Sequence, residues 1–143
     1  MNYKTSLAFR KETLVKLLNA IVLLEDEIVQ ALYDDFKKPA FEAVLTETNY
    51  VITELKDTIK NLNKWAKPER VWPSILNFPS TDYILREPYG KVLIIAPWNY
   101  PFQLALCPLV SAVAAGNQVF LKPSELTPNT AAIIKKIIEK VFH

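Results

Sequence analysis

The sequence predicts an α/β fold in which a helical front is followed by the first strands and helices of a parallel sheet. Apolar residues recur at three- and four-residue spacing through residues 14–65, which is the period of an amphipathic helix. Residues 83–141 instead alternate short runs of branched apolar residues with helical segments joined by short connections, an order typical of a parallel α/β sheet. The length of 143 residues and the hydrophobic content of 50% fit one globular domain.

The helical front begins with one apolar stripe that indicates one or two packed helices: Leu14, Leu17, Leu18, Ile21, Leu24, Ile28 and Leu32. The acidic run from Glu25 to Glu27 favours a break there, because carboxylates stabilise the first turn of a new helix. Pro39 interrupts the pattern, a further helix is expected from about Phe41, and Pro68 stops it. The apolar side of that helix is predicted to contain Val44, Leu45, Val51, Ile52, Leu55, Ile59, Leu62 and Trp65.

Residues 71–79 (VWPSILNFP) form a separate segment of prolines and large apolar side chains. This composition does not fit a helix and is too apolar for a free linker, so we expect the segment to lie against another surface. Residues 83–85 then predict a strand, and residues 87–90 predict a turn.

The rear of the chain predicts a strand, a helix, a strand and a helix in that order. Residues 91–95 (KVLII) are continuously apolar after the first position, which predicts a strand that is buried on both faces. Residues 102–115 predict a helix that Gly116 ends, and residues 118–121 predict the second strand. The last helix is predicted to start at Pro128 with Thr127 as its cap. Its apolar face is Ile133, Ile134, Ile137, Ile138 and Val141, with Lys135, Lys136, Glu139 and Lys140 facing water.

Two short segments follow the two strands: residues 96–101 (APWNYP) and residues 122–125 (KPSE). Ligands bind at the carboxyl ends of parallel strands in such folds. The prolines stiffen the first segment, so the side-chain amide of Asn99 could be held in a fixed orientation and stabilise an oxyanion. On spacing alone, the alternative that Asn99 caps the following helix is favoured. Lys122 and Glu125 could grip a diol such as a ribose, and the alternative is a surface turn with a helix cap.

Composition excludes several classes of protein. The 17 Lys and Arg residues nearly balance the 15 Asp and Glu residues and are spread along the chain, so we expect no nucleic-acid partner. No apolar run reaches the roughly 18 residues that span a bilayer, and the start has no apolar signal core, which predicts a soluble cytoplasmic protein. Cys107 is the only cysteine, so we expect neither a disulfide nor a metal site. Its apolar setting, LALCPLV, favours a buried thiol over a nucleophile.

Residues 87–125, EPYGKVLIIAPWNYPFQLALCPLVSAVAAGNQVFLKPSE, resemble the aldehyde dehydrogenase superfamily, and the WNYP form is similar to its class-three-like branch. The combination of PWN and KPSE, separated by an apolar helix and AAGN, is specific, whereas either motif alone is weak. The resemblance is strongest over residues 80–138 and reaches the helical front less specifically. It implies a Rossmann-like NAD(P)-binding domain in which residues 1–69 are the N-terminal helices and residues 89–143 the first βαβα part. Residues 70–88 are implied to be an oligomerisation arm, and the catalytic domain is absent.

The resemblance also implies roles for individual residues. It assigns Asn99 as the residue whose amide holds the oxyanion. The wall that faces the cofactor is assigned to Ile95, Ala96, Pro97 and Trp98. The adenine-side ribose of NAD or NADP is assigned to Lys122, Ser124 and Glu125. An acidic residue at the ribose favours NAD. In the resembling enzymes a later cysteine attacks the aldehyde and a later glutamate activates water, and no residue here matches either.

The implied function is therefore oxidation of aldehydes to carboxylates by a complete enzyme, a homo-oligomer assembled through the arm. The isolated chain is expected to be inactive. The alternative is a non-catalytic truncated product that acts as an assembly or interaction module through the arm and an exposed sheet edge, because unpaired strand edges invite association.

Overall fold

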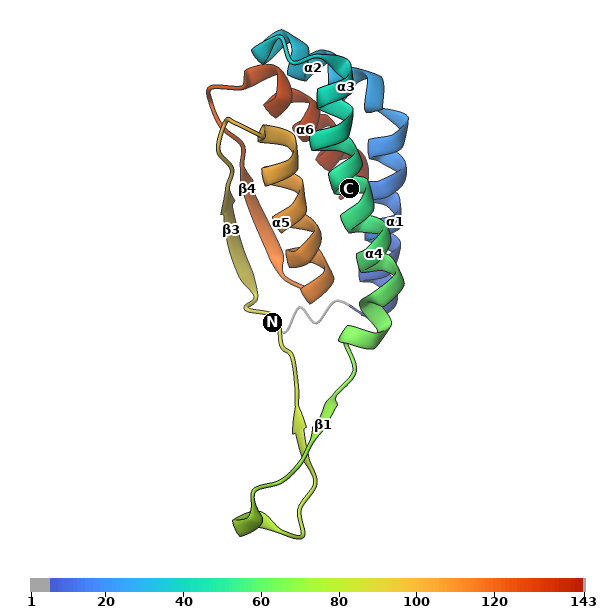
Figure 1. The fold of residues 1–143 in the computed structure, drawn as a ribbon, viewed down its shortest axis with the longest axis vertical. Helices are drawn as coiled ribbons and strands as arrows, with labels where there is room; N and C mark the ends of the chain where they lie inside the picture. The colour runs from blue at the N-terminus through green and yellow to red at the C-terminus, as the bar shows by residue number, and fades with distance from the viewer. Residues whose placement is uncertain (1–5, 143) are drawn as a thin grey trace.

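The computed structural model describes residues 6–142, and its first half is a set of packed helices (Figure 1). These are α1 (Leu7–Leu23), α2 (Glu25–Phe36), the short α3 (Ala40–Ala43), a π-helical turn η1 (Val44–Thr48) and α4 (Asn49–Trp65). The expected break near Glu25 is confirmed, because α1 ends at Leu23 and α2 begins with Glu25, Asp26 and Glu27 in its first turn. None of the helices within the described residues is long and apolar enough to cross a membrane.

The helix predicted from about Phe41 is interrupted by the π turn, which changes the buried face. Leu45 is 56% exposed and Trp65 is 44% exposed, so the prediction that they belong to the apolar side is wrong. A π turn holds one more residue than an α turn and therefore rotates the side chains around it. Glu47 and Thr48 take the inward positions instead, and Leu62 is the last buried residue of α4.

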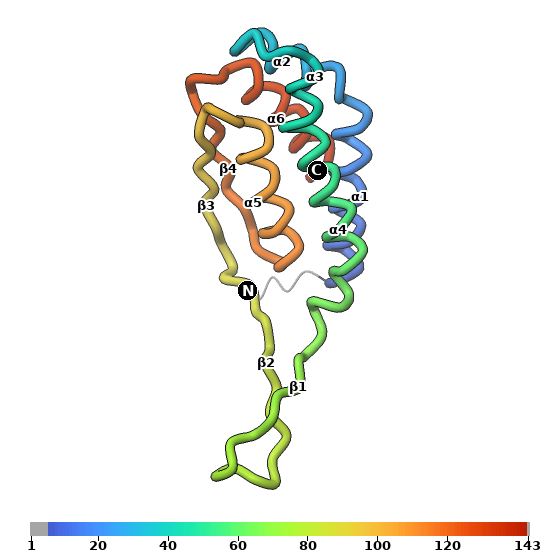
Figure 2. Tube along the Cα trace, in the orientation of Figure 1, coloured from blue at the N-terminus to red at the C-terminus, as the bar shows by residue number. Residues whose placement is uncertain are grey.

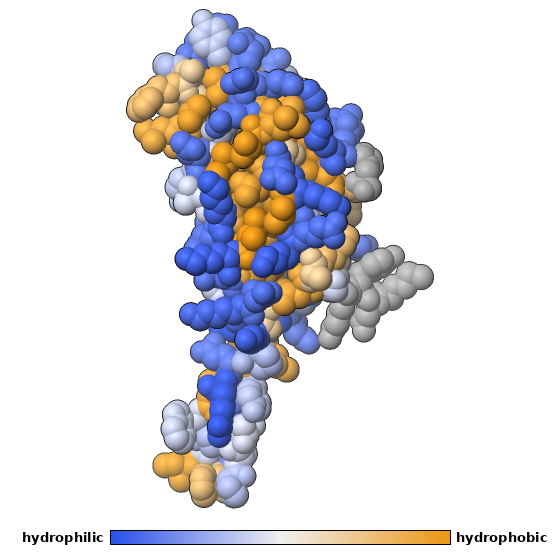
Figure 3. Space-filling model, turned by 90° about the vertical axis from the view of Figure 1, so that its right-hand side faces the viewer, coloured by the Kyte–Doolittle hydropathy of each residue, from blue (hydrophilic) through white to orange (hydrophobic). Residues whose placement is uncertain are grey.

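Residues 69–84 form an arm that projects away from the helices (Figures 1 and 2). Its two strands, β1 (Glu69–Val71) and β2 (Asp82–Ile84), pair in antiparallel register, and a 3-10 turn spans Ile75–Asn77 between them. The strand predicted at 83–85 is present one residue earlier, whereas β1 was not predicted. The large apolar residues between the strands are 77–97% exposed: Trp72, Ile75, Leu76 and Phe78. In Figure 3 the end of the arm carries orange, hydrophobic atoms beside paler ones. The expectation that residues 71–79 lie against another surface is wrong within the described chain.

The rear of the chain is the predicted parallel strand pair with its helices. Strands β3 (Lys91–Ile95) and β4 (Gln118–Lys122) are joined by α5 (Pro101–Ala115), and α6 (Pro128–Val141) follows. Burial alternates along both strands, and Leu93, Ile95 and Phe120 are 59–67% exposed. The prediction that residues 91–95 are buried on both faces is therefore wrong in this chain, because its helices cover only one face of the pair.

The predicted apolar face of the last helix is confirmed, and so are its start at Pro128 and Thr127 as its N-cap residue, but Thr127 makes no side-chain cap bond. Thr127 occupies the N-cap position of α6, yet its hydroxyl donates to the carbonyl of Ser124 and makes no cap bond. The carboxylate of Asp35, at the end of α2, accepts instead from the backbone N–H groups of Asn129 at 3.1 Å and Thr130 at 2.8 Å. A distant residue thus supplies the cap.

The carboxyl end of α5 is also completed from the helical front. Gly116 ends the helix as predicted, with a backbone φ of 90° that residues with a side chain rarely adopt. Arg10 of α1 donates from Nη1 to the carbonyl oxygens of Ala114 at 3.3 Å and Ala115 at 3.1 Å. A cation at this position complements the exposed carbonyl groups of the helix end.

Candidate site at the carboxyl ends of the strands

The two segments predicted to carry the site lie side by side. Ile95 and Lys122 are register partners at the ends of β3 and β4. The backbone N–H of Ala96 then donates to the carbonyl of Lys122 at 3.0 Å, which extends the pairing by one step. The parallel register therefore brings residues 95–99 and residues 122–125 to one edge of the sheet, as expected for a ligand site of this architecture.

The residues of the first segment present an open, largely apolar surface. Ile95 is 67% exposed and Trp98 is 54% exposed, and Pro97 and Asn99 are exposed as well. Ala96 differs because it is only 4% exposed and anchors the segment to β4. The first segment is therefore exposed to solvent at every position from Ile95 to Asn99 except Ala96.

The second segment combines an ion pair with a tight turn. The ammonium of Lys122 donates to Oε2 of Glu125 at 2.7 Å, and this hydrogen bond lowers the pKa of the exposed Glu125 carboxyl. Glu125 is therefore a carboxylate at neutral pH. A cationic donor and an anionic acceptor side by side offer complementary partners for two neighbouring hydroxyl groups.

Ser124 holds the turn rather than facing solvent. It is 7% exposed, and its Oγ accepts from the backbone N–H of Leu126 at 3.2 Å. Its carbonyl accepts from both the hydroxyl and the backbone N–H of Thr127. These bonds fix where the segment leaves β4 and where α6 begins.

The side-chain amide of Asn99, which is predicted to stabilise an oxyanion, does not cap α5. The N-cap residue is Tyr100, and no side-chain cap bond comes from it. The backbone N–H groups of Phe102 and Gln103 both donate to Oε2 of Glu47 at 3.0 Å. The capping role that spacing favoured for Asn99 is therefore wrong, because a carboxylate from η1 already occupies the first turn.

Glu47 belongs to a buried ion pair that the sequence prediction missed. Its other oxygen, Oε1, accepts from the ammonium of Lys38 at 2.5 Å, and the two side chains are 0% and 8% exposed. The ammonium also lies 4.6 Å from the centre of the Tyr100 ring. One signal was available: Glu47 falls on the apolar stripe between Val44 and Val51, where a carboxylate needs a partner.

Cys107 does not have the properties of a nucleophile. It is half-buried in α5, and burial, with Glu54 as a smaller cause, raises the pKa of its thiol from 9.0 to about 11. The thiol is therefore protonated at neutral pH, and the nucleophilic form is the thiolate.

We expect iodoacetamide to alkylate Cys107 about a hundredfold more slowly at pH 7.5 than an ordinary thiol, because a pKa of about 11 in place of 9.0 lowers the thiolate fraction by that factor. The rate should rise about tenfold per pH unit until it levels near pH 11. Mass spectrometry measures this directly, since the chain has one cysteine. Rapid labelling that levels near pH 7 would contradict the raised pKa.

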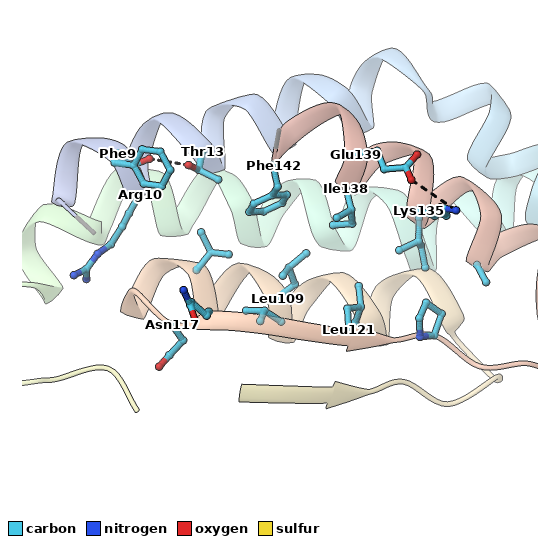
Figure 4. A pocket seen from close by; sticks show the side chains of 16 residues that line it. Phe9, Arg10, Thr13, Leu109, Asn117, Leu121, Lys135, Ile138, Glu139 and Phe142 are labelled. Atoms are coloured by element: carbon cyan, nitrogen blue, oxygen red, sulfur yellow. Dashed lines mark hydrogen bonds and ion pairs between the residues drawn. The ribbon is translucent and has the colours of Figure 1, made fainter. Parts of the chain in front are cut away.

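An apolar cavity of about 850 Å³ lies elsewhere, between α1, α5, α6 and β4 (Figure 4). Leu109, Leu121, Ile138 and Phe142 are among its lining residues, and none of the eight predicted site residues lines it. Residues 6–142 also contain no group of three side chains suited to holding a metal ion. The site predicted from the sequence is therefore an open sheet edge rather than a closed pocket.

Comparison with known proteins identifies the family. The aldehyde dehydrogenase family profile matches residues 3–142. The chain is 48% identical over 136 residues to the 4,4'-diaponeurosporen-aldehyde dehydrogenase of Staphylococcus aureus, covering 95% of this chain and 30% of that protein. It is 43% identical over 116 residues to aldehyde dehydrogenase family 3 member H1 of Arabidopsis thaliana, covering 81% of this chain and 24% of that protein. The chain belongs to the aldehyde dehydrogenase family, as the sequence motifs predicted.

Solved structures agree with this assignment. Substrate-bound AldH of Staphylococcus aureus matches with a TM-score of 0.93 at 47% identity, covering 97% of this chain and 30% of that chain. AldA, the indole-3-acetaldehyde dehydrogenase of P. syringae solved with NAD+, matches with a TM-score of 0.79 at 27% identity, covering 96% and 27%. The α/β fold class is therefore confirmed as the N-terminal part of the aldehyde dehydrogenase fold, and the chain spans less than a third of the length of these relatives.

Proposed function

We propose that this chain is the N-terminal part of an NAD(P)-dependent aldehyde dehydrogenase that oxidises aldehydes to carboxylates in the cytoplasm. Asn99 stabilises the oxyanion that forms when the aldehyde carbonyl is attacked. Its position at the edge shared by β3 and β4, with its capping role taken by Glu47, is the observation that carries this assignment.

The strand-end residues fit one half of a nicotinamide dinucleotide. Lys122 and Glu125 hold the adenine-side ribose, because their ion pair presents a donor and an acceptor to neighbouring hydroxyl groups. Ser124 sets the turn that carries them, and the wall is formed by Ile95, Ala96, Pro97 and Trp98. The ionised Glu125 favours NAD over NADP, since a 2'-phosphate would face a carboxylate. NAD or NADP held by these residues would supply the hydride acceptor for the oxidation.

The isolated chain is proposed to be inactive. No residue in it matches the nucleophilic cysteine or the general-base glutamate of the family, and Cys107 has a raised pKa. We expect residues 1–143, mixed with NAD and a panel of aliphatic and aromatic aldehydes, to form no NADH above the rate without protein. Aldehyde-dependent NADH formation that Asn99→Ala abolishes would contradict the proposed incompleteness.

The size of the native product tests the proposal in the source cells. An antibody against residues 70–88, which include the apolar end of the arm, should detect a denatured band several times heavier than the 16.3 kDa of this chain. A band near 16.3 kDa would instead favour the second candidate, a short product that acts as an assembly or interaction module.

The exposed apolar end of the arm is the observation that favours this second candidate. Trp72, Ile75 and Leu76 are 93–97% exposed, and a patch of this kind is typical of an association surface. In the full enzyme we propose that the same arm contributes to a homo-oligomer. Sedimentation that shows a folded monomer of the isolated chain at high concentration would exclude the interaction module.

A further inference from the structure

We propose that the buried Lys38–Glu47 ion pair positions residues 96–101, the Asn99 loop, and that it acts through Tyr100 and the first turn of α5. This inference rests on the proposed function, because it takes Asn99 to be the residue that stabilises the oxyanion. Glu47 is fully buried and Lys38 nearly so, and both act on Asn99 through other groups. They are therefore positioning residues and not catalytic ones.

Both oxygens of Glu47 are committed. Oε2 accepts from the backbone N–H groups of Phe102 and Gln103 at 3.0 Å each, and Oε1 accepts from Lys38 at 2.5 Å. A buried carboxylate without partners is costly, and here the amino end of α5 and the ammonium offset that cost. Because the carboxylate accepts two bonds from α5 and one from Lys38, in the connection after α2, it fixes the start of α5 relative to Lys38.

Lys38 acts on the residue beside Asn99. Its ammonium lies 4.6 Å from the centre of the Tyr100 ring, within the range of a cation–π contact. Pro101 restricts the backbone of Tyr100, which has a φ of -135° and a ψ of 69°. The ring and the backbone of Tyr100 are thus both constrained immediately after Asn99.

Asn99 therefore lies between fixed points. On one side Ala96 is bonded to Lys122 at 3.0 Å, and on the other Tyr100 and Phe102 are held by the ion pair. An amide that stabilises an oxyanion is effective only when it is oriented before the reaction begins. The ion pair supplies this orientation from outside the loop.

The π turn is the backbone feature that places Glu47 against α5. Glu47 lies within η1, and the hydroxyl of the next residue, Thr48, donates to Oε1 of Glu25 at 2.7 Å and lies 3.3 Å from the carbonyl oxygen of Val44. Insertions of this kind occur frequently at functional sites. Here the turn directs two adjacent polar side chains into the helical core.

A double-mutant cycle in the full-length protein that contains these residues tests the proposal, with NADH formation from an aldehyde as the readout. Glu47→Gln keeps the size of the side chain and removes its charge. We expect kcat to fall about ten- to a hundredfold, the range that misplacement of a reacting group produces, with KM for NAD little changed. In the Asn99→Ala background, the same substitution should change kcat by no more than about twofold, because no oriented amide remains to be lost.

Asp35→Asn is the control, since Asp35 is also a carboxylate that accepts from two backbone N–H groups in the first turn of a helix, and its hydrogen bonds go to Asn129 and Thr130 of α6. Any effect of this control should be the same with and without Asn99. Lys38→Met should act in the same direction as Glu47→Gln, and Lys38→Arg should restore most of the activity. The two Lys38 variants carry the test if Glu47→Gln does not fold.

The outcomes separate the two proposals. If Asn99→Ala leaves kcat unchanged, the proposed function of Asn99 fails. If Asn99→Ala lowers kcat while Glu47→Gln, or Lys38→Met in its place, has no effect or an equal effect in both backgrounds, the positioning role is overturned and the role of Asn99 stands.

Discussion

Replacing Asn99 with alanine is expected to lower kcat of the full-length protein by about 10²- to 10³-fold, which corresponds to about 2.7–4 kcal/mol of transition-state stabilisation. Asn99 lies at the edge where β3 and β4 end. The backbone N–H groups in the first turn of α5 donate to Glu47, so Asn99 is not needed as a cap. The substitution therefore removes an amide donor without removing a helix cap. Steady-state kinetics with a saturating aldehyde and varied NAD measures the effect.

Asn61→Ala is a suitable control for that experiment, because within residues 6–142 the Asn61 amide donates to Asp57, one turn earlier in α4. It should leave both kcat and KM unchanged. If Asn99→Ala instead raised KM for NAD and left kcat intact, Asn99 would belong to the cofactor surface and not to the oxyanion site.

Gly116→Ala is expected to lower the free energy of unfolding by about 2–4 kcal/mol, since two costs combine. The φ of 90° is strained for any residue with a Cβ, and that atom would lie 2.5 Å from Cζ of Arg10. The guanidinium would have to move, and its bonds to the carbonyls of Ala114 and Ala115 would be lost. Urea unfolding of the 143-residue chain, followed by circular dichroism, measures the change.

Gly90→Ala separates the two costs. Gly90 has a similar φ of 99°, but a Cβ there would meet nothing within 4 Å. This variant should lose only about 1–2 kcal/mol, the conformational part of the effect. Equal losses at the two glycines would show that Arg10 moves aside without cost and does not stabilise α5.

Local signals were sufficient to predict most element boundaries. Pro101 and Gly116 bound α5, and Pro128 begins α6, because proline and glycine act on the backbone at their own positions. The strand pair followed from short runs of branched residues and from the short connections between them. The site residues could be placed on one edge for the same reason, since parallel strands end together.

The features that were missed depend on partners that are distant in sequence. Asp35 caps α6 from 94 residues away and Glu47 caps α5 from 55 residues away, and no local pattern names such a partner. The apolar character of Leu93 and Ile95 was read as burial on both faces, but hydrophobicity does not say which residues provide the cover. The π turn has no reliable sequence signature, although Glu47, a carboxylate on the apolar stripe, indicated that a buried partner was needed.

The helix caps supplied by Arg10, Asp35 and Glu47 have a consequence for the order of folding during synthesis. All three residues leave the ribosome before α5 and α6 exist, and the bonds they make span 104, 94 and 55 residues. Contacts of such separation form late, after chain closure has been achieved. We expect the front helices to associate first and then to act as an internal template, on which each later helix is completed as it emerges.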